Sequence, residues 1–319
     1  MQVFRRLPPA GQRRPCALTI GNFDGVHRGH QAILARLGSE AARLGLPSCV
    51  LTFEPNPREF FAARGKGQAP ARISTLRDKL EALAQYGIER VDIAHFGASL
   101  AACSAESFIE DILVGGLQLR YLLVGDDFRF GAQRRGDFAM LSRFASAKGF
   151  ELASVATVSD EFGRISSSAV RQALDGGDLR RAEDLIGRPY SISGHVVHGR
   201  KLGRDFGFPT LNLRLPFAKP AASGIFVVRV HGLAGQALPG VASLGTRPAV
   251  EPDGRPLLEV HLFDFAQDVY GRLVRVEFVH KLRDEQPFET LDLLKAQIAR
   301  DAQAARDYFS TPAQSSAAP

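Results

Sequence analysis

The sequence contains few cysteines, and none of them has a metal-binding or disulfide spacing. Cys16, Cys49 and Cys103 occur singly along 319 residues. Disulfide frameworks and zinc sites need paired or clustered cysteines, so this pattern predicts neither kind of site. Isolated cysteines are typical of a reducing compartment, and we expect a cytoplasmic protein.

Long apolar runs are also missing. No stretch approaches the roughly 18 consecutive apolar residues of a membrane span. The arginines near the N-terminus are interrupted by Pro8, Pro9 and Gly11, and no apolar segment follows them. This arrangement argues against a signal peptide, and we expect no membrane association.

A continuous basic tract is absent, although the formal net charge is +6. The basic residues are scattered among acidic ones without interleaved aromatic side chains, so we expect no nucleic-acid-binding face. Small phosphorylated molecules would suit the charge, and an ordinary solvated basic surface would explain it equally well. Weak self-association of the chain is left open.

The pattern of apolar residues predicts an α/β protein with two domains. A chain of this length exceeds the size that one core usually serves. From Ala17 to about Gly187, near-continuous apolar runs alternate with amphipathic segments, which predicts a doubly wound parallel sheet covered on both faces by helices. The predicted strands cover residues 16–23, 48–53, 90–96, 120–125 and 151–158. Ligands of such sheets bind outside the carboxyl ends of the strands.

The second half of the chain has the pattern of a small antiparallel barrel. Its strands show apolar residues at every second position and are separated by glycine, proline and aspartate turns. They cover residues 190–198, 224–230, 257–265 and 273–280. Residues 288–309 have a helical apolar spacing and should pack on the barrel. We predict domains at 1–187 and 188–310, followed by a disordered tail at 311–319.

The first candidate site follows the first predicted strand, where the chain reads GNFDGVHRGH from Gly21 to His30. A helix should begin around His30, and a helix N-terminus attracts phosphate through its unpaired N–H groups. Histidines add donors that stabilise charge as it develops on a phosphoryl oxygen. Two histidines at this spacing could equally be capping residues, core residues or half of a metal site.

A second group of polar residues follows the fifth predicted strand, in the segment RISSSAVR from Arg164 to Arg171. A serine at a helix start is first of all an N-cap. Three serines followed by an arginine one turn later also form an anion-binding cradle, because the guanidinium can bind two phosphate oxygens.

Together these two segments resemble the nucleotidyltransferase superfamily, with its HxGH and ISSTxxR signatures. GNFDGVHRGH is typical of the FMN adenylyltransferase domain of bacterial bifunctional riboflavin kinase and FAD synthetase proteins, and TFEPNPREFF and VGDDFRFG match the same family. The resemblance implies that His27, His30 and Arg171 are catalytic and that the flavin lies near Phe61, Asp127, Phe128 and Arg129. It implies ATP-binding residues in this half at Gly21, Phe23, Asp24, Gly25, His27, His30, Ser166, Ser167 and Arg171.

The third candidate site is a glycine-rich basic loop that leads into a strand, from Gly194 to Asn212. Thr210 and Asn212 are on alternate positions of the strand and should face the same side, where their oxygens would suit magnesium held together with phosphate. Taken alone, the segment could be an ordinary hairpin with a basic turn.

GRDFGFPTLN resembles the GRxLGFPTAN signature of riboflavin kinases, and the similarity continues through later segments of this half. The family implies a six-stranded barrel, Glu259 as the catalytic base, and Thr210 and Asn212 as residues that organise Mg²⁺ and ATP. It implies ATP- or flavin-binding residues at Gly199, Lys201, Gly203, Arg204, Thr210, Asn212 and Arg283. The resemblance as a whole implies that riboflavin is phosphorylated to FMN and FMN is adenylylated to FAD, with ATP and Mg²⁺ in both steps.

Four positions depart from the family patterns. Asn56 replaces a histidine and Ser168 a threonine, and both retain hydrogen-bonding groups. Leu211 replaces an alanine, and we expect it to point away from Thr210 and Asn212. Ala249 replaces a threonine, which removes one hydroxyl and leaves kinase efficiency open.

Two other functions agree with parts of the sequence. One is transfer of a nucleotide to a different phosphate acceptor, such as a pantetheine or choline phosphate, against which the kinase-like second half argues. The other is a flavin-binding regulator without turnover. A pure binder needs no base, so Glu259 and the two histidines argue against that reading.

Overall fold

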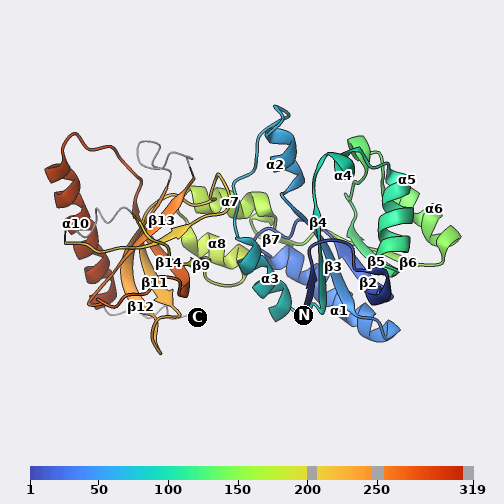
Figure 1. The fold of residues 1–319 in the computed structure, drawn as a ribbon, viewed down its shortest axis with the longest axis horizontal. Coiled ribbons are helices and arrows are strands. Elements are labelled where there is room, and N and C mark those ends of the chain that lie inside the picture. The colour runs from blue at the N-terminus through green and yellow to red at the C-terminus, as the bar shows by residue number, and fades with distance from the viewer. Residues whose placement is uncertain (200–206, 246–254, 312–319) are drawn as a thin grey trace. The chain divides into compact units, whose positions relative to one another are not determined.

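The structure is a computed structural model that describes residues 1–199, 207–245 and 255–311. The chain forms two compact units, and Figure 1 shows their elements. The first unit contains residues 1–70 and 79–166, and the second contains 71–78 and 167–319. The domain boundary predicted after Gly187 stays a prediction. Four candidate residues and most of the predicted tail lie outside the described residues: Lys201, Gly203, Arg204, Ala249 and 312–319.

The first unit contains a six-stranded parallel sheet in the order β1-β4-β3-β2-β5-β6. This confirms the predicted doubly wound sheet. The strands are β1 (Gln2–Phe4), β2 (Cys16–Ile20), β3 (Ser48–Glu54), β4 (Arg90–His95), β5 (Leu119–Gly125) and β6 (Glu151–Val155). The short edge strand β1, which pairs with β4, was not predicted.

Helices cover both faces of this sheet, as the continuous apolar strands require. Cys16, Leu18 and Ile20 pack on one face with η2 and α6, and the buried side chains of α1 belong to the core as well. The helices are α1 (Arg28–Leu44), α2 (Pro57–Ala62), α4 (Ala98–Ala102), α5 (Ala105–Ser107), the π-helix η2 (Phe108–Gly116) and α6 (Phe138–Lys148), together with α3 (Leu76–Gln85), whose first three residues belong to the second unit. Short 3-10 turns and a hairpin complete the unit: η1 (Ala10–Gln12), η3 (Ala132–Arg134), β7 (Ser159–Asp160) and β8 (Gly163–Arg164).

The strand order brings two of the candidate segments to neighbouring strand ends. From β2 the chain continues through α1 to β3 on one side, whereas β5, on the other side of β2, continues through α6 to β6. The direction of connection therefore reverses between β2 and β5, and doubly wound sheets bind ligands at this position. The segment after β2 begins at Gly21, and the segment after β5 begins at Asp126.

The second unit contains a six-stranded antiparallel sheet in the order β10-β13-β12-β11-β14-β9. Its two edges meet where the Val197 N–H donates a 2.8 Å hydrogen bond to the Asn212 carbonyl, so the sheet is nearly closed into the predicted barrel. The strands are β9 (Ser191–His195), β10 (Leu211–Arg214), β11 (Gly224–His231), β12 (Leu238–Gly245), β13 (Leu257–Leu262) and β14 (Leu273–Arg283).

The barrel unit includes, among its described residues, the helices α7 (Ser167–Asp175), α8 (Leu179–Ile186) and α10 (Leu291–Ser310). The last of them was predicted to pack on the barrel. It does so by burying Ala302 and Ala305 against Ile225, Val227 and Val241, and Figure 1 shows it running beside β11 and β12. None of the helices in the described ranges is long and apolar enough to cross a membrane.

Residues 71–78 are joined to the barrel by hydrogen bonds that connect distant parts of the sequence. The Arg72 N–H donates to the Lys219 carbonyl over 2.7 Å, and the Ser193 N–H donates to the Asp78 carboxylate over 3.1 Å. Burial raises the pKa of Asp78, while hydrogen bonds from Thr75 and Ser193 act in the opposite direction.

Candidate active sites

The two histidines of the first candidate site lie together at the start of α1. His27 is the N-cap, and its Nδ1 accepts a 3.4 Å hydrogen bond from the His30 N–H. The two rings are stacked with centroids 3.7 Å apart, and Phe23 packs against His30. The helix begins at Arg28, two residues before the predicted start, because His27 can cap it. The paired imidazoles therefore lie at the positive end of a 17-residue helix.

The loop between β2 and α1 has an unusual backbone. Phe23 and Val26 adopt φ values of 47° and 42°, a region that side chains other than glycine rarely occupy, and Gly25 between them has φ 81°. Phe23 and Val26 are both fully buried, so packing maintains this conformation. Strain of this kind is concentrated at functional sites.

Gly29 brings the helix start against the beginning of the serine-rich segment. A Cβ at this position would lie 3.0 Å from the Ile165 carbonyl and 3.2 Å from the His27 ring. Ser166, which follows Ile165, lies in the same unit as the histidines. Glycine therefore favours the close approach of the two segments at this position.

The rest of the serine-rich segment belongs to the second unit. Ser167 is the first residue of α7, and Arg171 lies one turn later on the same helix. The Arg171 Nε donates a 2.6 Å hydrogen bond to the Ala71 carbonyl. The role of Ser167 and Arg171 in holding phosphate stays a prediction.

The predicted flavin-binding residues lie in two places within the first unit. Phe61 is on α2, where it makes edge contacts with Phe60 and Phe96 and remains 36% exposed. Asp127, Phe128 and Arg129 follow β5. A partly exposed aromatic side chain within an aromatic cluster suits a planar ring.

Arg164 is a residue of this region that the sequence analysis did not assign to the flavin group. Its Nη2 donates a 3.0 Å hydrogen bond to the Asp127 carboxylate, which links β8 to the segment after β5. The two residues are separated by 37 positions, and no local pattern marks such a pair.

Asn56, which stands where the family pattern has a histidine, caps the start of α2. Its Oδ1 accepts a 3.0 Å hydrogen bond from the Arg58 N–H, and the Glu59 carboxylate accepts one of 3.1 Å from the Asn56 N–H. These reciprocal bonds form a capping box at the start of α2.

Replacing Asn56 with alanine is expected to lower the free energy of unfolding by about 1 kcal/mol, since an N-cap is lost. The apparent KM for FMN should rise as well, because α2 carries Phe61, which we predict to contact the flavin. Urea unfolding and initial rates of FAD formation measure the two effects. Asn56→Ser retains a capping oxygen and should lie near the wild type, and an alanine variant with unchanged stability would contradict this role.

Three candidate residues of the barrel, Asn212, Glu259 and Arg283, lie in one cross-strand row. Asn212 on β10 is directly opposite Glu259 on β13, and Glu259 is directly opposite Ser243 on β12. The row continues through Ile225 on β11 to Arg283 at the end of β14. Directly opposed side chains point to the same face of a sheet. Asn212, Glu259 and Arg283, which come from separate segments of the sequence, therefore share one face of the sheet.

Arg283 also fixes the C-terminal helix. Its guanidinium binds both carboxylate oxygens of Asp301 on α10, with Nη2 to Oδ2 at 2.7 Å, and Gln297 donates to the same carboxylate. Asp301 is largely buried. No local sequence pattern marks this pair, because it joins a strand end to a helix 18 residues later.

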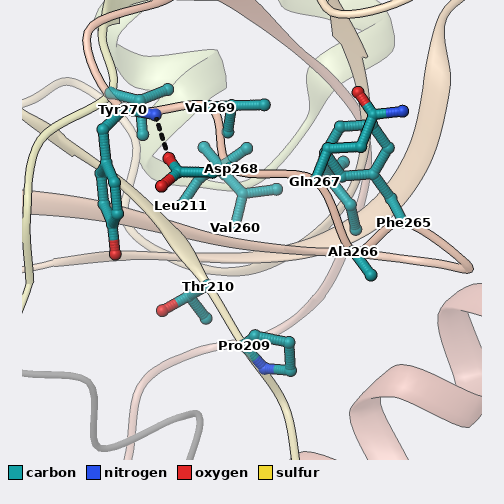
Figure 2. Close-up of a pocket in the computed structure, with 12 residues that line it drawn as sticks. Pro209, Thr210, Leu211, Val260, Phe265, Ala266, Gln267, Asp268, Val269 and Tyr270 are labelled. Carbon is teal, nitrogen blue, oxygen red and sulfur yellow. Dashed lines mark hydrogen bonds between the residues drawn. The ribbon is translucent and has the colours of Figure 1, made fainter.

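Thr210 lies in a pocket at one end of the barrel, with a volume of about 430 Å³. Figure 2 shows Thr210 and Tyr270 at one end of the pocket wall and Phe265 and Gln267 at the other. Leu211 lines the same pocket, so the expectation that it packs away from Thr210 is wrong. Thr210 precedes β10, so the alternation of the strand does not determine its direction, and a shared side for Thr210 and Asn212 stays a prediction.

Asn212 and Gly199 are in close contact. A Cβ at Gly199 would collide with the Asn212 amide nitrogen, so a larger residue here would have to displace this side chain. The Asn212 Oδ1 is buried and has no hydrogen-bond partner among the described residues. A buried oxygen of this kind is costly unless a ligand binds it.

Replacing Gly199 with alanine should displace the Asn212 amide and lower kcat/KM for riboflavin phosphorylation about 10- to 100-fold, since small misplacements cost this much. Steady-state kinetics of the kinase reaction test this expectation. Gly235→Ala is a matched control, because no atom lies within 4 Å of a Cβ at that position. Equal activity of the two alanine variants would contradict the predicted role of Asn212.

Family models match the two halves of the chain separately. A model described as FAD synthetase matches residues 10–169, and one described as riboflavin kinase matches residues 186–309. The first range contains the histidine and serine-rich segments, and the second contains the cross-strand row.

Relatives named "Bifunctional riboflavin kinase/FMN adenylyltransferase" extend over nearly the whole chain. The one from Escherichia coli (strain K12) is 50% identical over 294 residues, which are 92% of this chain and 93% of its own length. The one from Haemophilus influenzae is 45% identical over 312 residues, 98% of this chain and 100% of its own.

A solved structure named as a macrolide-efflux protein from Streptococcus pneumoniae is also similar. Its TM-score is 0.71 at 30% sequence identity, and the match covers 92% of this chain and 94% of that one. The name of that protein differs from the names of the curated relatives, which are closer to this chain in sequence.

Proposed function

The chain belongs to the family of bifunctional riboflavin kinases and FMN adenylyltransferases, and we propose that its two reactions use two separate groups of residues. With ATP, it phosphorylates riboflavin to FMN and adenylylates FMN to FAD, releasing pyrophosphate. The observation that carries the proposal is the row of Asn212, Glu259 and Arg283 on one face of the barrel.

Adenylyl transfer needs charge neutralisation rather than a base. The attacking group is the phosphate of FMN, which is already an anion at neutral pH. We assign the ATP phosphates to the stacked pair His27 and His30, where the N-terminus of α1 adds positive potential. Gly21, Phe23, Asp24 and Gly25 form the loop that leads to them.

The serine-rich segment and the segment after β5 complete the proposed assignment. Ser166, Ser167 and Arg171 would donate hydrogen bonds to phosphate oxygens, as the family signature implies. Phe61, Asp127, Phe128 and Arg129 would bind the flavin of FMN. The position of the β2 and β5 ends at the reversal of strand connections supports this assignment.

Phosphorylation of riboflavin needs a base. The ribityl hydroxyl is neutral and must lose its proton as it bonds to the γ-phosphate. We assign Glu259 this role, since its carboxylate lies on the same face as Asn212. Gly199 and Thr210 would contact ATP, and the pocket beside Thr210 is large enough for an apolar ring.

We propose Mg²⁺ as the metal of the kinase reaction, with Asn212 and Thr210 as its protein ligands. The Asn212 Oδ1, which is buried and has no partner within the part of the chain that the structure describes, fits a hard cation, which prefers oxygen donors. Magnesium is commonly bound by one or two protein groups together with substrate phosphates, and it neutralises charge on them. Within the described ranges, no group of three histidine, cysteine or acidic residues could hold a metal by itself.

We further propose that the protein is cytoplasmic and that its partners are small molecules. All three cysteines are unpaired, which suits a reducing compartment. The scattered basic residues favour phosphorylated substrates over nucleic acid.

One assay tests the assignment of function. Purified protein is incubated with riboflavin, ATP and magnesium, and the flavins are separated by chromatography over time. FMN should appear first and FAD later. Absence of FMN under any magnesium concentration, with folded protein, would contradict the kinase assignment.

A further inference from the structure

A second carboxylate lies beside the proposed base. Glu285 follows β14, and its Oε1 accepts a 3.1 Å hydrogen bond from the Ser243 hydroxyl. Ser243 is the direct cross-strand neighbour of Glu259, and such neighbours have Cβ atoms roughly 5 Å apart. Glu285 is therefore held next to Glu259 on the same face of the barrel.

The Glu285 carboxylate occupies space beside Gly245, a residue without a side chain. A Cβ on Gly245 would collide with the Glu285 carboxylate, so glycine leaves the space that the carboxylate fills. Glu285 remains exposed to solvent while Ser243 fixes one of its oxygens. An ionised carboxylate has room for several donors, so its free lone pairs can bind a ligand.

We propose that Glu285 binds hydroxyl groups of the ribityl chain of riboflavin and that Ser243 positions Glu285 for this contact. The inference rests on the kinase function proposed above. A carboxylate only accepts hydrogen bonds, and the ribityl chain carries several hydroxyl donors. Holding the hydroxyls that do not react would bring the reacting one to Glu259. The same negative charge repels nucleotide phosphates, so this position selects the alcohol substrate.

Replacing Glu285 with glutamine tests the contact. We expect the KM for riboflavin to rise about 10- to 100-fold. A hydrogen bond to a charged group is lost in this variant, and such a bond contributes about this factor to affinity. The KM for ATP and the rate of FMN adenylylation should stay at wild-type values. Asp284→Asn is the matched control, because the neighbouring carboxylate binds the Lys281 ammonium at 2.6 Å instead of Ser243.

Variants of Ser243 test how Glu285 is positioned. Ser243→Ala should raise the KM for riboflavin in the same direction, and Ser243→Thr, which keeps the hydroxyl, should restore it. A threonine variant as impaired as alanine would contradict the hydrogen-bond role. Melting temperatures of the full chain identify variants that fail to fold.

The outcomes separate this inference from the function on which it rests. Wild-type protein that forms no FMN overturns the kinase function itself. Active wild-type protein together with an unchanged riboflavin KM in Glu285→Gln overturns only the role of Glu285. An equal rise in the KM for ATP would also contradict it, because the contact is assigned to riboflavin alone.

Discussion

Replacing Glu259 with glutamine is expected to stop phosphorylation of riboflavin while FMN is still converted to FAD. Glutamine retains the size and hydrogen-bonding shape of the side chain but cannot accept a proton from the ribityl hydroxyl. Loss of a general base typically lowers a rate 10²- to 10⁴-fold, and we expect an effect of about this size on kcat. Chromatography of flavins formed from riboflavin, and separately from FMN, measures the two reactions.

Glu277→Gln provides the control for this variant. Glu277 is a strand carboxylate of the same barrel, but it binds His231 and Arg229 instead of belonging to the row. We expect it to retain riboflavin phosphorylation. Loss of both reactions in Glu259→Gln would argue that the two chemistries share a site, and full kinase activity would remove Glu259 from its role.

Replacing His30 with alanine is expected to stop the reaction sequence at FMN. His30 stacks on His27 at the start of α1, and we propose that this pair stabilises the negative charge that develops as pyrophosphate leaves. Removing one donor that stabilises such charge typically costs about 10²- to 10³-fold in rate. Riboflavin should still be phosphorylated, so FMN should accumulate in the chromatographic assay.

The His30→Ala variant loses both a hydrogen-bond donor and the packing of the His30 ring on Phe23. A second variant separates these two effects. His30→Gln keeps a side-chain N–H and part of the volume, and we expect it to retain more adenylyl transfer than alanine does. Wild-type FAD production by the alanine variant would contradict the assignment of His30.

The regular parts of the fold were predictable because burial leaves a clear sequence pattern. The run at 16–23 predicted β2, since a parallel strand covered on both faces is apolar throughout. Alternation at 257–265 predicted β13, where Leu258, Val260 and Leu262 are buried and the residues between them are not. The helix on the barrel was predicted from spacing alone.

Features created by contacts between distant segments were not predictable. Residues 71–78 lie in the first half of the sequence and include the start of α3, yet they join the barrel unit through Arg72 and Asp78. The edge strand β1 is only three residues long and has no apolar pattern of its own. The Arg283–Asp301 pair likewise depends on tertiary packing.

Among the candidate site residues, too, some were predictable from local sequence and others depend on contacts between distant segments. The family resemblance pointed to His27, His30, Asn212 and Glu259, and their catalytic roles stay predictions. The orientation of Leu211 could not be inferred, since Thr210 lies outside the strand whose alternation was assumed. Ser243 and Glu285 belong to no motif of the sequence analysis, and only the strand register brings them to Glu259.

A mixing experiment tests the division into two independent reactions most directly. Purified Glu259→Gln and His30→Ala are each incubated with riboflavin, ATP and magnesium, alone and together, and FAD is measured over time. We predict no FAD from Glu259→Gln, only FMN from His30→Ala, and FAD from the mixture as released FMN reaches the intact adenylyl-transfer residues. A mixture that forms no FAD, although each variant retains its own half of the chemistry, would contradict the account.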